Sequence, residues 1–317
     1  MSAVKKMLEL NAQASKVFAQ LVDDALALKV EIQEIAGATL VDCGINAPGG
    51  LEAGRRLAEL CLAGLGTVSI VPASSAGASL GVCVRTDHPV AACLASQYAG
   101  WRIAQGDFFA MASGPMRAVA GREELFDKIG FREAAPGTLV GVMETSQLPT
   151  VEVIESIAES CHVSADRLLL AAAPTTSLAG CLQISARSVE TALHKLEQLD
   201  FDLARIVSGF GQAPLPDPTP EFVEAIGRTN DAILYHSEVT LWVRGDDASL
   251  AEITPQVPSS ASPDHGRPFA DIFRGYNGDF YQIDPLLFSP AVVRLVNIET
   301  GTEFLAGMMG SNAARQT

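Results

Sequence analysis

Short apolar blocks bounded by glycine, proline and polar residues alternate along this chain with longer stretches in which apolar residues recur every three or four positions. The first pattern is typical of buried β-strands and the second of amphipathic helices. Strands are predicted in a hairpin at 30–44 and at 67–71, 80–84, 138–143, 168–173, 232–235, 239–243 and 291–297. Helices are predicted at 3–28, 51–65, 89–99, 151–160, 184–199 and 220–226.

These strands and helices do not alternate strictly, and the C-terminal part carries hairpin signals, so the pattern favours an α+β fold over a doubly wound sheet. A chain of 317 residues exceeds the usual size of a single hydrophobic core. We therefore expect one unit, residues 1–317, made of two α/β subdomains with a ligand cleft between them. No linker marks the internal boundary; QAPLPDPTP at 212–220 is the strongest local break, and the small polar tail at 310–317 is expected to fray.

The helix at 220–226 carries a clear start signal, because Thr219 can cap its first turn and Pro220 suits the first helical position. A longer signal lies at 168–199, where an apolar strand breaks at Pro174 into the hydroxyl loop Thr175, Thr176 and Ser177 and then becomes a helix. The carboxyl end of such a strand is where α/β layers usually place their functional groups.

Charge and motif content exclude several classes of protein. The 37 acidic and 22 basic residues give a net charge of −15 without a basic cluster, so neither a nucleic acid nor an anionic membrane is an expected partner. The acidity is compatible with a cationic ligand, although an ordinary soluble surface explains it as well. The start lacks the apolar block of a signal peptide and no apolar run is long enough to span a membrane, so we expect a cytoplasmic protein.

The six cysteines lie mostly inside apolar runs and form no CxxC pair, and the five histidines form no HExxH motif. Reduced core cysteines and the absence of a metal site are therefore expected. The chain also lacks GxGxxG, GxxxxGK[ST] and GxSxG, which disfavours dinucleotide binding, a P-loop and an ordinary α/β-hydrolase.

Arg187 and Glu190 are the first candidates for chemistry, because residues three apart lie on the same face of a helix. From spacing alone, however, an exposed ion pair on a solvated helix surface is the favoured explanation. A similar spacing, Arg56 with Glu59, occurs in the helix at 51–65, where chance similarity between amphipathic helices is the simpler explanation.

Four further segments carry polar residues that either bind a ligand or only form turns. Ser113 and Arg117 are expected at the start of a helix, and Asp42 and Asn46 precede paired glycines. Asn230 is expected in a polar turn that enters a strand. The long loop around residues 258–274 contains a histidine and an arginine and is either a lid or merely flexible.

Six blocks, in this order, resemble the methenyltetrahydromethanopterin cyclohydrolase family over about residues 11–307. The blocks are VDCGINAPGGLEAGRRLAELCLAGL, AGWRIAQGDFFAMASGPMRA, APTTSLAGCLQISARSVE, GRTNDAILY, PSSASPDHGRPFADIFR and DFYQIDPLLFSPAVV.

The resemblance implies hydration of 5,10-methenyltetrahydromethanopterin to the 5-formyl compound in one-carbon metabolism, without a metal or redox cofactor. It also implies two subdomains with the pterin in the cleft and a homotrimeric assembly. An enzyme of different one-carbon chemistry, such as a formyl transferase or a folate-type cyclohydrolase, and a non-catalytic pterin-binding protein remain as alternatives.

The family's QISxRxxE segment matches residues 183–190 and implies that Arg187 and Glu190 are catalytic. Glu190 would accept a proton from the attacking water, and Arg187 would orient that carboxylate and hold its pKa low enough for it to act as a base near neutral pH. Weaker candidates for holding the pterin and its tail lie in the matching blocks: Asp42, Asn46, Ser113, Arg117, Thr175, Thr176, Ser177 and Asn230.

Overall fold

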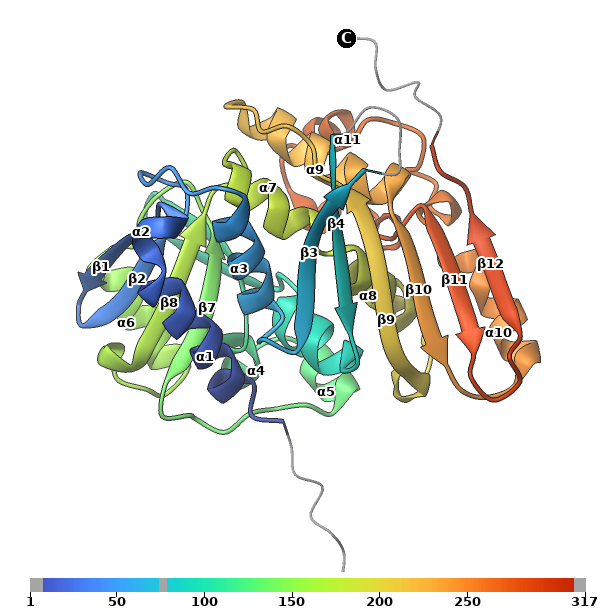
Figure 1. Cartoon of the computed structure of the whole chain (residues 1–317), viewed down its shortest axis with the longest axis horizontal. Coiled ribbons are helices and arrows are strands. Elements are labelled where there is room, and N and C mark those ends of the chain that lie inside the picture. Colours follow the sequence, from blue (N-terminus) through green and yellow to red (C-terminus); the bar gives the residue numbers. More distant parts are fainter. Residues whose placement is uncertain (1–7, 74–78, 311–317) are drawn as a thin grey trace, which may run out of the picture.

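Two six-stranded mixed sheets lie side by side in the computed structural model, which describes residues 8–73 and 79–310 (Figure 1). Strands of the first sheet follow the order β1-β2-β8-β7-β6-β5, and strands of the second follow β12-β11-β10-β9-β4-β3. The mixture of helices with two mixed sheets confirms the α+β prediction.

The first sheet has a parallel centre, in which β2, β8 and β7 run in the same direction, and antiparallel edges. Its strands are β1 (Glu31–Ile35), β2 (Ala38–Asp42), β5 (Trp101–Gln105), β6 (Phe108–Ser113), β7 (Leu139–Glu144) and β8 (Leu168–Ala173). Residues 139–143 of β7 are all buried, as expected for a parallel strand that is covered on both faces. Helices α1 (Leu10–Asp23) and α3 (Leu51–Cys61) cover one face, and α6 (Val151–Ser160) covers the other.

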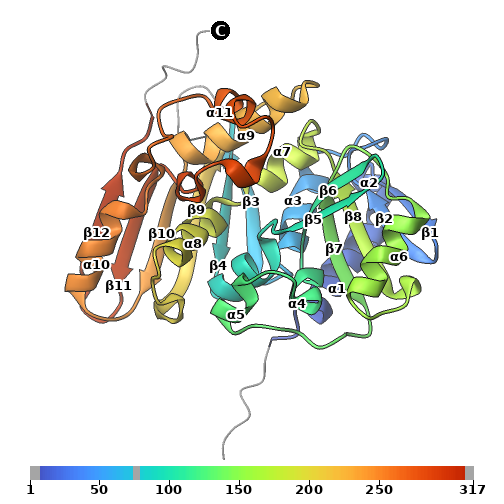
Figure 2. The same cartoon turned by 180° about the vertical axis from the view of Figure 1, so that it is seen from behind.

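The second sheet is covered on one face only. Its strands are β3 (Gly66–Pro72), β4 (Leu80–Thr86), β9 (Ile206–Pro214), β10 (Glu238–Val243), β11 (Val292–Asn297) and β12 (Glu303–Gly307). Burial alternates strictly along β10 and β11. Helices α8 (Ser188–Gln198) and α10 (Asp247–Ile253) lie on the face seen in Figure 2, whereas the opposite face has no helix in front of it in Figure 1.

The remaining helices connect or cap these layers. They are α2 (Ala25–Leu28), α4 (Met116–Ala120), α5 (Leu125–Ile129), α7 (Leu178–Ser185), α9 (Phe222–His236), α11 (Phe269–Gly275) and a π-helix, η1 (Val90–Gln97). The chain builds β1 and β2 in the first sheet, β3 and β4 in the second, β5 to β8 in the first and β9 to β12 in the second. Because each subdomain is assembled from separate segments, no single linker divides the sequence.

Three sequence predictions are wrong in instructive ways. The apolar block 232–235 is not a strand but the end of α9, whose apolar residues Ile226 and Ile233 recur at helical spacing. The helix predicted at 220–226 begins at Phe222 and runs on to His236, with no side-chain cap from Thr219. The helix predicted at 184–199 is two helices, α7 and α8, separated after Ser185.

Helix boundaries differ at two other places. The stretch predicted as a helix at 89–99 forms the π-helix η1, and the helix predicted at 3–28 ends at Asp23 before the short α2, while its residues 3–7 lie outside the described part. In the predicted tail Gly310 is placed by a hydrogen bond from its backbone N–H to the Tyr235 carbonyl, 2.7 Å, and residues 311–317 lie outside the described part.

Strand β9 was not predicted from the sequence, because Gly209 and Gly211 interrupt its apolar pattern. Both glycines lie under the first turn of α8: a Cβ atom on Gly211 would be 2.4 Å from Ser188 Oγ, and one on Gly209 would be 2.8 Å from Val189 Cγ1. The glycines therefore let the helix that carries Glu190 lie directly on the second sheet.

Candidate active site

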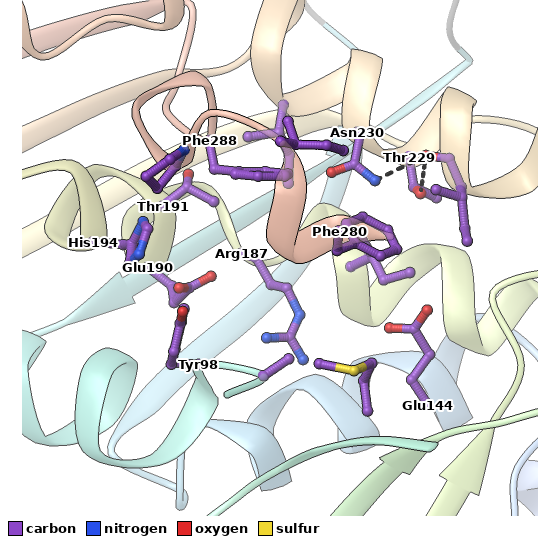
Figure 3. Close-up of a pocket in the computed structure, with 17 residues that line it drawn as sticks. Tyr98, Glu144, Arg187, Glu190, Thr191, His194, Thr229, Asn230, Phe280 and Phe288 are labelled. Carbon is purple, nitrogen blue, oxygen red and sulfur yellow. Dashed lines mark hydrogen bonds between the residues drawn. The ribbon is translucent and has the colours of Figure 1, made fainter. Parts of the chain in front are cut away.

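A pocket of about 300 Å³ lies where the two subdomains meet (Figure 3). The carboxyl end of β7, the residues after η1, helices α7, α8 and α9 and the segment 280–288 all contribute to it. It is lined by Tyr98, Ala99, Met111, Glu144, Ile184, Arg187, Glu190, Thr191, His194, Ile226, Thr229, Asn230, Ile233, Phe280, Ile283, Pro285 and Phe288.

The break between α7 and α8 brings Arg187 and Glu190 into this pocket. Helix α7 ends at Ser185, and Arg187 occupies the capping position before α8. The Gln97 side chain stabilises the break, because its Nε2 donates to the Ala186 carbonyl at 3.1 Å. The end of the π-helix is thus tied directly to the backbone of the catalytic candidates, which fits the frequent occurrence of π-helical segments near functional sites.

The Arg187 guanidinium is 7% exposed and is held by neutral acceptors. Nη1 donates to the Gln97 carbonyl at 2.5 Å, and Nη2 donates to Gln183 Oε1 at 3.0 Å and to Ser113 Oγ at 3.4 Å. Neither an ion pair nor a hydrogen bond between Arg187 and Glu190 occurs in the described structure, so Arg187 does not orient that carboxylate by direct contact. The alternative of an exposed ion pair is also wrong, because both side chains are buried.

Glu190, in the first turn of α8, is 4% exposed. Burial raises the pKa of its carboxyl to about 7, and the positive charges of Arg187 and Arg117 oppose that increase. The charge of Arg187 acts in the expected direction, and although the loss of hydration outweighs it, the carboxyl still titrates near neutral pH. A carboxyl with a pKa near the working pH can both accept and return a proton.

Tyr98 and His194 form the wall beside Glu190. Their rings are stacked with centroids 5.1 Å apart, and burial lowers the pKa of His194 to about 4, so the imidazole is neutral at neutral pH. Arg117 lies behind this wall rather than in the pocket: its guanidinium is 5.1 Å from the centre of the Tyr98 ring and forms an ion pair with Glu123. Its other donors reach the Leu94 and Ser96 carbonyls.

The hydroxyl loop after β8 has two structural tasks. Thr175 is buried, and its Oγ1 donates to Oε1 of Glu144, which lines the pocket. Ser177 caps α7 by accepting from the Gly180 N–H at 3.0 Å, and Thr176 is half-buried. None of the three hydroxyl residues lines the pocket itself.

Asp42 and Asn46 do not reach the pocket either. The Asp42 carboxylate accepts the backbone N–H groups of residues 44, 45, 46 and 47 at 2.6–3.0 Å. Its acceptors are therefore used to shape the loop after β2, and Asn46 is exposed on that loop. Ser113 is buried below the pocket and contacts it only through Arg187.

Asn230 lines the pocket from α9, together with Thr229. The segment that contains both is helical, not a turn, and their side chains donate to helix carbonyls one turn earlier: Asn230 Nδ2 to Ile226 at 2.9 Å and Thr229 Oγ1 to Ala225 at 3.0 Å. Among the predicted residues, Arg187, Glu190 and Asn230 thus meet in one cavity.

An apolar wall formed by Phe280, Ile283, Pro285 and Phe288 closes another side of the pocket. It is tied to α8 by the buried Lys195, whose Nζ donates to the Leu286 carbonyl. Sequence reasoning missed this wall, Tyr98 and Glu144. Glu144 carried a usable signal, because it is an acidic residue at the carboxyl end of an apolar strand.

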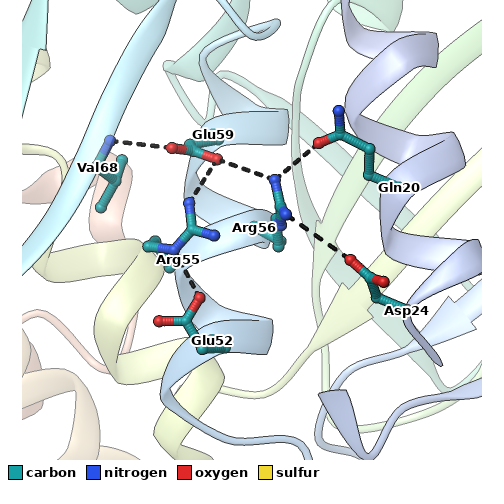
Figure 4. A network of polar contacts seen from close by, with 7 residues as sticks. All are labelled: Gln20, Asp24, Glu52, Arg55, Arg56, Glu59 and Val68. Carbon is teal, nitrogen blue, oxygen red and sulfur yellow. Dashed lines mark hydrogen bonds and ion pairs between the residues drawn. The ribbon is translucent and has the colours of Figure 1, made fainter. Parts of the chain in front are cut away.

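Two other predicted segments serve structural purposes. The segment 258–274, predicted as a long loop, ends in most of helix α11. Just before that helix the carbonyl of Arg267 accepts from the Tyr235 hydroxyl at 2.5 Å, which holds the segment on α9. Arg56 and Glu59 belong to an ionic network that joins α3 to α1 and the start of β3, with Arg56 Nη1 donating to Gln20 Oε1 at 2.7 Å (Figure 4). Neither segment lines the pocket.

A search of residues 8–73 and 79–310 finds no cluster of three or more histidine, cysteine, aspartate or glutamate residues suited to a metal ion. Within the same residues, no helix is both long and apolar enough to cross a membrane.

Comparison with known proteins identifies the family to which this chain is similar. The family model described as Cyclohydrolase (MCH) matches residues 9–316. Methenyltetrahydromethanopterin cyclohydrolase of Rhodopirellula baltica is 46% identical over 314 residues, which cover 98% of this chain and 94% of the relative. The enzymes of that name from Xanthobacter autotrophicus and Methanosarcina barkeri are 48% and 42% identical, covering 90% of this chain and 86% and 90% of the relatives. The chain therefore belongs to the methenyltetrahydromethanopterin cyclohydrolase family.

Proposed function

We propose that this protein hydrates 5,10-methenyltetrahydromethanopterin to 5-formyltetrahydromethanopterin. The family model, which matches residues 9–316, and the names of the relatives support this reaction. The observation that carries it is Glu190, a buried carboxyl with a pKa of about 7 on the wall of a pocket that is large enough for a ring system. A formyl transferase or a non-catalytic binding protein is not favoured by the relatives.

Glu190 has the properties that the reaction needs from a base. The methenyl carbon belongs to an amidinium cation, so it is electrophilic and requires an activated water. Glu190 accepts a proton from that water as the C–O bond forms, and then returns it to N10 as the C–N10 bond breaks. The added water leaves a hydroxyl group on the former methenyl carbon. The proton of this hydroxyl group is lost as the formyl C=O group forms, so one proton is released overall.

Arg187 supports this cycle through its charge. Its guanidinium is fixed by the Gln97 carbonyl and the Gln183 side chain, so a positive charge stays near Glu190 throughout the reaction. That charge keeps the pKa of Glu190 from rising further in the buried site. Without it, the carboxyl would be protonated over more of the neutral range and would be a poorer base.

We further propose that the reaction needs no metal or cofactor and takes place in the cytoplasm. The substrate carbon already carries a positive charge, so it needs no Lewis acid to attract water. Activity of purified protein that survives treatment with a chelator is the expected result.

The decisive test follows the loss of the methenyl chromophore with purified wild-type protein and Glu190→Gln. Removing the base is expected to lower kcat by a factor of about 10² to 10⁴. Glu155→Gln, at an exposed site on α6, is the matched control and should retain wild-type turnover. Turnover of methenyltetrahydrofolate in preference to the methanopterin compound, or near wild-type activity in Glu190→Gln, would contradict the proposal.

We also propose a homotrimer, in which the open face of the second sheet contacts another copy. Strand register places Phe210, Thr240, Arg294 and Leu305 in one row across β9, β10, β11 and β12 on that face. Phe210 is 38% exposed and Leu305 is 58% exposed. Exposed apolar side chains at both ends of this row, on a sheet face that no helix covers, support contact with a protein surface.

A further inference from the structure

A second carboxylate, Glu144, lines the pocket away from Glu190. It is the last residue of β7, at the carboxyl end of the parallel part of the first sheet. Figure 3 shows its side chain on the opposite side of Arg187 from Glu190. Glu144 is therefore separated from the water-activating end of the pocket.

Glu144 is fixed in place but lacks a cationic partner. Thr175 Oγ1 donates to its Oε1, and this threonine is buried in the turn after β8. No lysine, arginine or histidine in the described structure forms an ion pair with Glu144. Its partner across strands β6 and β7 is the apolar Met111, and the apolar Ile184 also lines the pocket. A half-buried carboxylate without a cationic partner is stabilised by hydrogen bonds from N–H donors, and a bound ligand can supply such donors.

The substrate class provides donors of the right kind. A pterin carries a 2-amino group next to the N3–H of its pyrimidinone ring, so two N–H donors point in the same direction from one edge of a flat ring. Carboxylates bind two parallel N–H donors well, and an oxygen that already accepts one hydrogen bond retains a second acceptor site.

We propose that Glu144 is the residue that binds the 2-amino and N3–H edge of the pterin, with Thr175 as the positioning residue that orients it. This inference rests on the proposed function. It places the pyrimidinone ring beside Met111 and Ile184, and it leaves the methenyl carbon for the end of the pocket that contains Arg187 and Glu190. Glu144 thereby contributes to binding and ring recognition rather than to proton transfer.

Glu144→Gln tests this assignment, because the amide keeps the shape but replaces one acceptor with a donor. Affinity for the cationic methenyl substrate and for the neutral formyl product is expected to fall by the same factor, on the order of 10- to 100-fold. Turnover at saturation should stay within a few-fold of wild type. Thr175→Val should lower both affinities in the same direction but less, and Glu155→Gln should change neither.

A substrate analogue with hydrogen in place of the 2-amino group gives the independent readout. Wild-type protein should bind it more weakly, whereas Glu144→Gln should show little additional loss for it. Glu144→Asp keeps the negative charge but shortens the side chain by one methylene, so it should also bind the pterin more weakly. This variant replaces Glu144→Gln in the test if the glutamine variant does not fold.

An affinity loss confined to the cationic methenyl form would instead mean that Glu144 pairs with the amidinium charge, and it would overturn the inference. Unchanged affinities in both variants would overturn it as well. Inactive wild-type protein would contradict the proposed function itself, which separates that failure from a failure of the Glu144 assignment.

Discussion

At the scale of single residues, burial decides what the two catalytic candidates can do. Arg187 and Glu190 are three apart in sequence, yet each faces different partners: the guanidinium is held by the Gln97 carbonyl and Gln183, and the carboxyl faces the pocket. Burial raises the pKa of Glu190 more than the nearby charges lower it. Spacing alone predicts an exposed ion pair on a helix surface, whereas the desolvated site produces a base that titrates near neutrality.

The pH dependence of the free enzyme should report this pKa. Glu190 is active as the carboxylate, and its folded pKa is about 7, so kcat/KM for hydration should fall as the pH drops through about 7 and level off above it. Initial rates at low substrate concentration between pH 5 and 9 measure the profile. A kcat/KM that stays constant from pH 9 down to pH 5 would show that Glu190 is not the group that limits the rate.

At the scale of elements, the position of α8 depends on two glycines in a neighbouring strand. Periodicity located the helical content of 184–199 but not the start of α7 at Leu178, and the break after Ser185 is stabilised by Gln97, which is distant in sequence. Strand β9 was missed because Gly209 and Gly211 are read as turn residues, although they are required by the close approach of Ser188 and Val189.

Gly211→Ala should therefore displace the first turn of α8. A Cβ atom there would lie 2.4 Å from Ser188 Oγ and 2.9 Å from Val189 Cγ2, so the free energy of unfolding should fall by about 1–3 kcal/mol, the usual cost of overpacking. Catalytic efficiency should fall too, because Glu190 lies on the same turn. Chemical denaturation and steady-state assays measure the two effects, with Gly137→Ala, which has open space around it, as the control that should change neither.

At the scale of the whole molecule, the two sheets differ in what covers them. Helices cover both faces of the first sheet, while one face of the second presents the row from Phe210 to Leu305. The pocket forms between the subdomains, so each of them supplies only part of its wall. The proposed contact between subunits and the pocket thus use different surfaces of the fold.

Phe210→Glu should convert the proposed trimer into monomers, because each interface would bury an unpaired charge. Light scattering coupled to size-exclusion chromatography measures the mass. Leu26→Glu, at a side chain that is 95% exposed on α2, should leave the mass unchanged. A monomeric wild type would contradict the trimer, and a trimeric Phe210→Glu would contradict only the assignment of this surface.

The sequence by itself determined the α+β class, most strands and the pair Arg187 and Glu190, because hydrophobic periodicity and a motif of neighbouring residues are local properties. Only the tertiary structure decided that Asp42 shapes a loop, that Arg117 supports Tyr98 from behind and that Glu144 lines the pocket. These assignments depend on which distant segments of the chain supply hydrogen-bond partners and which of them exclude water. Residue type and spacing do not show which distant segments come together, so the burial and the pKa of Glu190 could be obtained only from the folded chain.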